Sequence, residues 1–178
     1  MVYQFCSTSK VTFAGAGIAA LSSSPANIAD IKSKVQWSTI GPDKINQLRH
    51  VRFFGDADGL REHMKKHAAI IRPKFEEVIE TLDKELSELE IAQWSHPTGG
   101  YFVSFDAMEG CAKKIVAKCK EAGLVLTGAG AAFPYGKDPK DSNIRIAPTM
   151  PTMDELKEAM QLFITCVKLV SVEKLLEA

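Results

Sequence analysis

The chain has 178 residues, a hydrophobic fraction of 46%, and 22 basic side chains that balance 22 acidic ones. This composition is that of a globular protein of one domain, or one and a half small ones, and it argues against disorder. The even charge balance lacks the basic excess that nucleic acids or acidic membranes require, so we expect neither as a partner. No uncharged apolar run of about 18 residues and no signal peptide is evident, so we expect no membrane span and a cytoplasmic location.

The first fifty residues predict one short strand and two helices. Residues 11–21 are glycine-rich, which favours a tight loop leading into a buried strand. Ser24 and Pro25 are typical of a helix N-cap and first helical position, and we expect this helix to continue until Gly41-Pro42. A second short helix is expected over residues 43–54.

Gly55–Gly59 then breaks the pattern before the longest periodic segment, which runs from Leu60 to Leu89. Its apolar residues recur at steps of three and four, which predicts a helix with one buried stripe over about eight turns. Pro73 falls inside this segment and should kink the helix. A long helix after such a break is typical of a chain that passes between domains, so we divide the chain into residues 1–55 and 56–178.

The second half has the pattern of a small α/β domain with helices packed on a short sheet. Thr152 and Glu155 have the spacing of a capping box, which predicts the start of a final helix that buries residues from Leu156 to Val170. We further expect strands over residues 101–105, 124–127 and 143–147, and a helix over residues 110–122 that Gly123 ends.

Lys10 is the first candidate for chemistry, because it follows Ser7-Thr8-Ser9 and precedes a glycine-rich loop. In the phosphate-binding loop of nucleotide hydrolases the glycines precede the lysine, so that motif is not matched. A solvated surface lysine is the simple alternative. Phe5 and Phe13, however, could partly desolvate the amine and lower its pKa, which would make it a nucleophile. The hydroxyls of Ser7 and Ser9 suit phosphate oxygens, so the segment fits a phosphorylated aldehyde.

Cysteine, histidine and tryptophan give weaker signals. The cysteines have no CxxC spacing and are interpreted as reduced thiols. The i, i+4 histidine pair has two lysines between its members, so we expect a solvated helix face and no metal. Both tryptophans are interpreted as packing residues. The residues concerned are Cys6, Cys111, Cys119, Cys166, His63, His67, Trp37 and Trp94.

Three motifs in order resemble fold-type I aminotransferases, which bind pyridoxal 5'-phosphate. Ser7–Lys10 looks like the cofactor-lysine motif, Pro97–Phe102 like the entry to the small-domain strand, and Asn143–Pro148 like the segment with the carboxylate-binding arginine. The segments Ile40–His50 and Ala131–Gly136 are most similar to a bacterial subgroup of aspartate aminotransferases. The resemblance covers essentially the whole chain.

This resemblance implies an α/β PLP-dependent transferase fold, with residues 1–55 as a remnant of the large domain and 56–178 as the small domain. It implies that Lys10 holds the cofactor as a Schiff base and then acts as the base in catalysis. Ser7 and Ser9 would contact the cofactor phosphate, and Arg145 would bind the substrate carboxylate. The implied reaction moves an amino group between an amino acid, aspartate first, and a 2-oxo acid, in a homodimer.

Some features depart from the family. Many members have a phosphate-binding arginine where this chain has Ile18, and roughly the first half of such an enzyme precedes the lysine. We therefore expect this chain alone to be a poor catalyst, with uncovered apolar residues Phe13, Ile18, Leu21 and Ile31 that favour self-association. Alternatives are an aminotransferase for alanine, aromatic or aminoadipate substrates, a cofactor-sensing domain of a transcription regulator, or a fragment that serves only folding or dimerisation.

Overall fold

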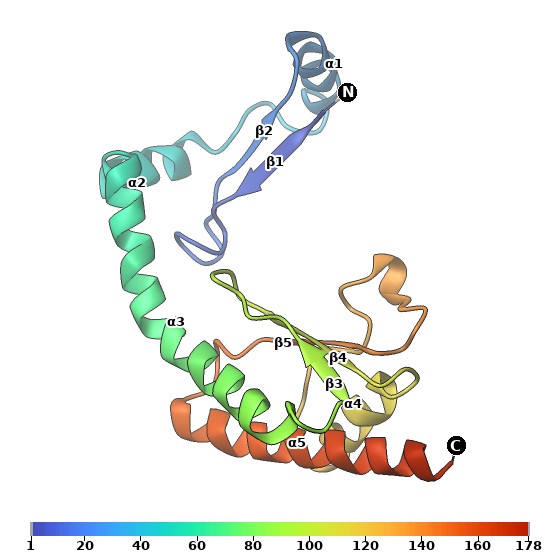
Figure 1. Cartoon of the computed structure of the whole chain (residues 1–178). Coiled ribbons are helices and arrows are strands. Elements are labelled where there is room, and N and C mark those ends of the chain that lie inside the picture. The colour runs from blue at the N-terminus through green and yellow to red at the C-terminus, as the bar shows by residue number, and fades with distance from the viewer. Residues whose placement is uncertain (1, 178) are drawn as a thin grey trace. The chain divides into compact units, whose positions relative to one another are not determined.

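The computed structural model describes residues 2–177 (Figure 1). These residues divide into two compact units, an N-terminal unit that extends to Ile70 and a C-terminal unit that starts at Ile71. The division falls inside a long helix rather than at residue 55. Assignment of the two parts to a large and a small domain stays a prediction.

The N-terminal unit contains a two-stranded antiparallel ribbon and two short helices. Strand β1 pairs with β2 so that Phe5 lies opposite Leu21. Strand β1 precedes the glycine-rich segment and β2 follows its glycines, so their pairing brings the two ends of this segment together. The elements are β1 (Gln4–Ser7), β2 (Ala19–Ser22), α1 (Pro25–Val35), α2 (Lys44–Phe54) and the first part of α3 (Ala57–Leu86).

Both predicted helix starts are confirmed by their caps. The Ser24 hydroxyl accepts a hydrogen bond from the Asn27 N–H, and the Asp43 carboxylate accepts one from the Asn46 N–H at 2.9 Å. The predicted end of the first helix at Gly41-Pro42 is wrong, because α1 stops at Val35. There the Ser38 hydroxyl donates to the Val35 carbonyl at 2.9 Å, and such side-chain bonds compete with continued helix.

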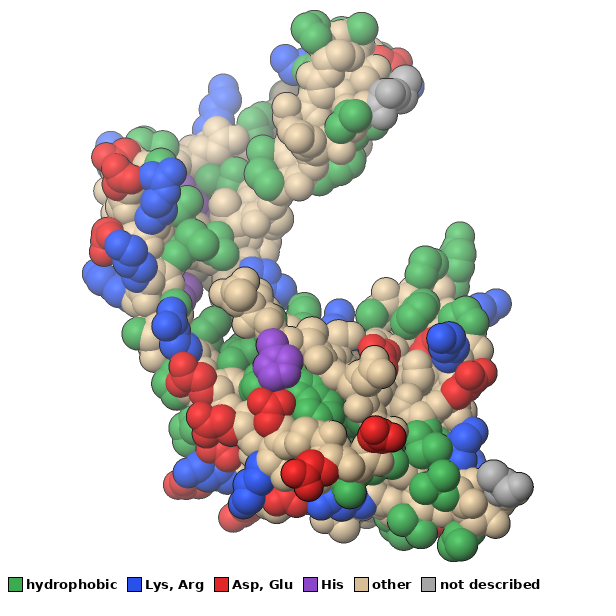
Figure 2. Space-filling model, in the orientation of Figure 1, with side chains coloured by type: hydrophobic (Ala, Val, Ile, Leu, Met, Phe, Trp, Pro, Cys, Tyr) green, Lys and Arg blue, Asp and Glu red, His purple; other side chains and the backbone are tan. Residues whose placement is uncertain are grey.

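The N-terminal unit has little apolar core. Among its described residues only Thr12 and His50 are buried, and both are polar. Strand β2 is exposed, not buried as predicted, because a two-stranded ribbon has no layer of its own to cover it. Trp37 is 85% exposed and does not pack, contrary to prediction. Figure 2 shows apolar side chains on the surface of this unit. The four residues expected to be uncovered, Phe13, Ile18, Leu21 and Ile31, are instead half-buried.

The C-terminal unit has a three-stranded antiparallel sheet in the order β3-β4-β5, with helices packed on it (Figure 1). Side chains from β4, β5, α4, α5 and the second half of α3 form one core, which includes Phe105, Ile144 and Phe163. This is the predicted small α/β layer. The elements are β3 (Ala92–Trp94), β4 (Val103–Ala107), α4 (Ala112–Glu121), the 3-10 turn η1 (Pro134–Gly136), β5 (Asn143–Ile146) and α5 (Met153–Leu176).

Helix α5 matches its prediction closely. Thr152 and Glu155 form the reciprocal capping box, with the Thr152 N–H donating to Glu155 Oε2 at 2.7 Å. The predicted apolar stripe is buried from Leu156 to Val170. Gly123 lies directly after α4, with a φ of 96° that an ordinary residue rarely adopts, and so ends that helix as expected.

Three predictions about the central segments need correction. Helix α3 begins at Ala57, before Gly59, and only its C-terminal half is buried, at Val78, Leu82 and neighbouring positions. Pro73 lies inside this helix, and the kink expected there stays a prediction. Residues 124–127 do not form a strand, because the Leu124 N–H bonds back to the Cys119 carbonyl at 2.8 Å. The strand expected over residues 101–105 begins two residues later. In residues 2–177 no helix is both long and apolar enough to cross a membrane.

Candidate functional site

Lys10 lies in a tight turn between the two strands of the ribbon. The N–H groups of Val11 and Thr12 both donate to the Thr8 carbonyl at 2.9 Å, which closes the turn around Lys10. Across the ribbon, the Thr8 N–H donates to the Ile18 carbonyl at 2.8 Å. Lys10 is exposed and Phe5 is 78% exposed, so the expected desolvation by Phe5 is not found. The backbone therefore presents Lys10 on a closed, hydrogen-bonded turn.

The hydroxyls of Ser7 and Ser9 converge immediately before Lys10. Their Oγ atoms are 2.8 Å apart, and the Ser9 N–H donates to Ser7 Oγ at 3.2 Å. Gly17 makes this arrangement possible, because a Cβ there would lie 2.6 Å from Ser9 Oγ and 2.7 Å from Ser9 Cα. Exposed hydroxyl and backbone donors beside a lysine amine fit a phosphate-bearing aldehyde such as pyridoxal phosphate.

A buried polar cluster lies behind the Lys10 turn and was not found by sequence reasoning. The Thr12 hydroxyl is 3.0 Å from His50 Nε2, although 38 positions separate the two residues. The Asn46 side chain donates to the Ala16 carbonyl at 2.8 Å. The only local signal was that Asn46 and His50 are one helical turn apart on α2, which by itself indicates nothing about Lys10.

His63 and His67 do not lie on a solvated helix face as predicted. Both are half-buried, their ring centroids are 4.2 Å apart, and the His63 ring contacts Phe53 and Phe54 edge-on. Burial, followed by the charge of His67, lowers the pKa of His63. In the described part of the chain no three His, Cys, Asp or Glu residues are placed to share a metal ion. The pair is thus part of an aromatic cluster within the N-terminal unit.

Arg145 lies on β5, directly opposite Ser104 of β4 in the C-terminal unit. Its guanidinium stacks over the Phe102 ring at 4.3 Å from the centroid. Its Nε is buried, and no residue that the structure describes accepts a hydrogen bond from it. A half-buried guanidinium that is held in one plane by an aromatic ring is suited to bind a carboxylate.

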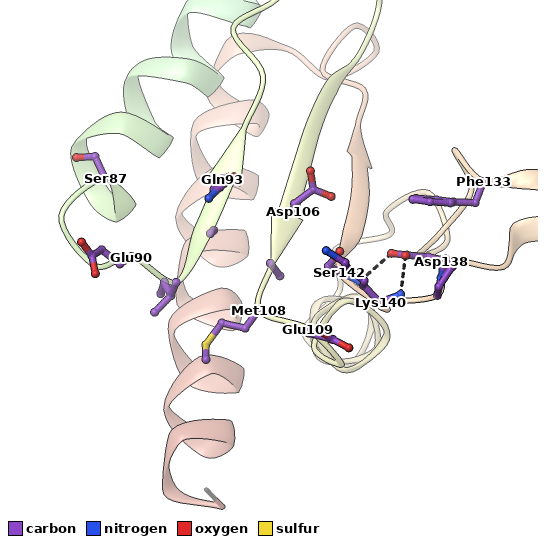
Figure 3. Close-up of a pocket in the computed structure, with 14 residues that line it drawn as sticks. Ser87, Glu90, Gln93, Asp106, Met108, Glu109, Phe133, Asp138, Lys140 and Ser142 are labelled. Atoms are coloured by element: carbon purple, nitrogen blue, oxygen red, sulfur yellow. Dashed lines mark hydrogen bonds between the residues drawn. The ribbon is translucent and has the colours of Figure 1, made fainter.

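A surface hollow in the C-terminal unit is lined by acidic side chains, among them Glu90, Asp106 and Glu109 (Figure 3). Asp138, also in its wall, accepts hydrogen bonds from the backbone N–H groups of Asn143, Ser142 and Lys140 at 2.8, 2.8 and 3.0 Å. These bonds lower the pKa of Asp138. Its carboxylate therefore holds the loop before β5, and none of the predicted site residues lines the hollow.

The cysteines are free thiols, as the sequence predicted. Three of them are buried in the C-terminal unit, and Cys6 is exposed. Burial, with a contribution from Cys166, raises the pKa of Cys119 to about 12. Trp94 packs as expected, since it stacks on Phe105 and its Nε1 donates to Asp83 at 2.8 Å. Trp94 and the three buried cysteines therefore serve packing.

Comparison with known proteins places these features in a family. The model of the aspartate amino-transferase family matches residues 1–178. A putative aminotransferase from Mycolicibacterium smegmatis is 53% identical over 172 residues, which cover 97% of this chain and 40% of that protein. An aspartate aminotransferase from Corynebacterium glutamicum is 46% identical over 171 residues, which cover 96% of this chain and 40% of that protein.

Solved structures agree with the sequence comparison. An aspartate transaminase from C. glutamicum superposes with a TM-score of 0.92 and 46% identity, over 97% of this chain and 41% of that one. A putative aminotransferase from Corynebacterium diphtheriae gives a TM-score of 0.92 and 50% identity, over 96% and 42% of the two chains. The chain thus spans about 40% of the length of these relatives. It belongs to the aspartate amino-transferase family.

Proposed function

We propose that this chain is the C-terminal portion of a pyridoxal phosphate-dependent aminotransferase that moves an amino group between aspartate and a 2-oxo acid. The observation that carries the proposal is the pair of hydroxyls, Ser7 and Ser9, that converge at 2.8 Å beside Lys10 within a family match that spans the chain. Aspartate is favoured as the substrate because a relative that is 46% identical is an aspartate aminotransferase.

Lys10 is proposed as the catalytic residue. Its amine would hold the cofactor through the cofactor's aldehyde, and Nζ would take a proton from the substrate α-carbon and return one. The bound cofactor supplies an electron sink for that step. Ser7 and Ser9 bind the cofactor phosphate through their hydroxyls, in place of the arginine that Ile18 replaces.

Arg145 is proposed to bind the substrate α-carboxylate. The stack on Phe102 supports this role, since it fixes the plane of a guanidinium group that can offer a carboxylate two parallel hydrogen bonds. Lysine at this position would keep the charge but lose the fork.

The two parts of the chain have different proposed origins. Residues 1–55 are the end of the large cofactor-binding domain, and residues 56–178 are the small domain. The sparse core of the N-terminal unit supports this, because its exposed Phe5, Ile45 and Phe53 require a cover that the rest of a longer enzyme would provide. The complete enzyme is proposed to be a cytoplasmic homodimer.

The test is to add pyridoxal phosphate to the complete enzyme, reduce with borohydride, and locate the cofactor by peptide mass spectrometry. We expect the adduct on Lys10 and none in Lys10→Ala. An adduct on another lysine would refute the assignment.

Steady-state rates on aspartate, alanine, aromatic amino acids and aminoadipate then identify the substrate. Arg145→Lys should lower kcat/KM by about 10- to 100-fold, which corresponds to losing a hydrogen bond to a charged group. If it leaves kcat/KM unchanged for every amino acid, Arg145 does not bind the carboxylate.

A further inference from the structure

Two side chains of α2 contact the loop that carries Lys10 at two separate points. Asn46 Nδ2 donates to the Ala16 carbonyl at 2.8 Å and lies 3.3 Å from the Gly17 carbonyl. One helical turn later, His50 Nε2 is 3.0 Å from the Thr12 hydroxyl. The first contact holds the C-terminal side of the loop, and the second holds the turn that immediately follows Lys10.

The hydrogen bonds of His50 define which nitrogen carries its proton. Nδ1 lies 2.8 Å from the Asn46 carbonyl oxygen, which can only accept, so Nδ1 is the protonated nitrogen. In the neutral ring Nε2 is therefore an acceptor, and it shares the single hydroxyl proton of Thr12 with the Thr8 carbonyl. The same hydroxyl lies 3.0 Å from both the carbonyl and the hydroxyl oxygen of Thr8. His50 is thus linked through Thr12 to Thr8, on the other side of Lys10.

The Asn46 contact reaches the proposed phosphate-binding hydroxyls. Gly17, whose carbonyl Asn46 approaches, is the residue that leaves room for Ser9. The next residue, Ile18, donates its N–H to the Thr8 hydroxyl at 2.7 Å. A shift of residues 16–18 would therefore move Ser9 and the start of the Lys10 turn together.

Apolar packing and hydrogen bonds both hold this loop against α2. Thr12 and His50 are 8% and 7% exposed, and in residues 2–70 no apolar side chain is buried to the same extent. The Phe13 ring lies 5.1 Å from those of His50 and Phe53 and 5.5 Å from that of Phe54, measured between centroids. The hydrogen bonds of Thr12 and His50 are buried, where water cannot replace them, and they add a directional constraint on the loop to these ring contacts.

We propose that Asn46 and His50 form a brace that fixes the Lys10 turn, and that both are positioning residues for the reaction at the Lys10 amine. The inference rests on the proposed function of Lys10. Neither residue touches the reacting atoms. They act by holding Thr12, Ala16 and Gly17, and hence the place from which the amine and the two serine hydroxyls act.

The sharpest test changes Thr12, because valine has the shape of threonine without its hydroxyl. Thr12→Val should accelerate hydrogen exchange of the Val11 and Ile18 amides by about tenfold, the factor for losing one net hydrogen bond. Thr12→Ser keeps the hydroxyl and should restore slow exchange. Thr39→Val is the matched control, since the Thr39 hydroxyl bonds only to the Gly41 carbonyl in an exposed loop.

Two outcomes of the exchange experiment would overturn the brace. In one, Thr12→Val leaves exchange at Val11 and Ile18 as slow as in Thr39→Val. In the other, Thr12→Val accelerates exchange equally throughout α1 and α2, which would show that the hydroxyl only stabilises the unit. His50→Gln is a second variant, because its amide can still accept from Thr12. It should exchange more slowly in the turn than His50→Leu, and equal rates in these two variants would also refute the brace.

A second readout follows the amine itself and is independent of the cofactor. The rate of acylation of Lys10 in the cofactor-free enzyme, measured at one pH by mass spectrometry, should change in Thr12→Val and stay the same in Thr12→Ser. An unchanged rate in both variants would refute positioning of the amine. If the brace variants behave as expected but borohydride fixes no cofactor on Lys10, the proposed function fails and the brace stands. If the adduct forms and the variants show no effect, the brace fails alone.

Discussion

Replacing Gly17 by alanine tests the geometry of the proposed site most directly. The new Cβ would lie 2.6 Å from Ser9 Oγ, 2.7 Å from Ser9 Cα and 2.8 Å from Ser9 N. Carbon contacts are most favourable at about 3.5–4.0 Å, so one segment must move by about 1 Å. Two of the three clashing atoms belong to the backbone, which means that a side-chain rotation of Ser9 cannot relieve the overlap.

The expected size of the effect follows from that displacement. A misplacement of about 1 Å near the reacting atoms costs on the order of 100-fold in rate. In the complete enzyme, Gly17→Ala should therefore lower kcat/KM by about that factor and weaken cofactor binding. The C-terminal unit, whose core contains none of these residues, should keep its unfolding midpoint.

Gly41→Ala is the matched control, because a Cβ at Gly41 meets no atom within 4 Å. Cofactor binding can be followed by fluorescence titration, and kcat/KM by steady-state assay with aspartate. The reasoning is refuted if Gly17→Ala retains a kcat/KM within about twofold of Gly41→Ala, since that would show that no displacement reaches the site.

Two further predictions concern the C-terminal unit. Thr152→Ala should lower its free energy of unfolding by about 1 kcal/mol in urea titrations, the usual cost of losing an N-cap. Hydrogen bonds from the Thr152 backbone and hydroxyl lower the pKa of Glu155 in the folded unit. The stabilisation that these bonds give is present above the pKa of glutamate in the unfolded chain, and it is lost as the pH falls through the pKa of Glu155 in the folded unit. Because the Thr152 backbone N–H also donates to Glu155, Glu155→Gln is the variant that should remove this pH dependence, and an unchanged loss of stability at low pH in Glu155→Gln would contradict it. At neutral pH a thiol reagent should modify Cys6 alone, because the other three cysteines are buried and burial raises the pKa of Cys119 to about 12. Equal labelling rates for Cys6 and Cys119 would refute the burial of Cys119.

Local signals predicted the helices well. The starts of α2 and α5 depend on N-caps that involve residues three positions apart, Asp43 with Asn46 and Thr152 with Glu155, and such pairs can be recognised in the sequence. The stripe of α5 is buried in one core, so its periodicity predicted burial correctly. The early part of α3 has the same periodicity, yet Met64 is 42% exposed. Periodicity shows which face is apolar, but the neighbours that would cover this face are not encoded nearby.

Strands were predicted less well because they depend on distant partners. Strand β3 has three residues, Ala-Gln-Trp, which are too few to show alternation. Leu124 and Leu126 do alternate with Val125, and they pack against the core while Val125 is 79% exposed, but this segment has no strand partner. The identity of Lys10 as a candidate came from a motif, whereas the Thr12–His50 contact joins residues 38 positions apart and no sequence spacing indicated it.

The contrast between a filled core after Ile71 and a nearly empty one before it has a practical consequence for protein engineering. The core of the C-terminal unit is formed by its own residues. Exchanging this unit between family members at its boundary should therefore preserve its fold. The N-terminal unit has no complete core of its own, so its sequence must be designed together with the protein surface that covers it. A chimaera that ignores this would contain Lys10 without the surroundings that the proposed reaction requires.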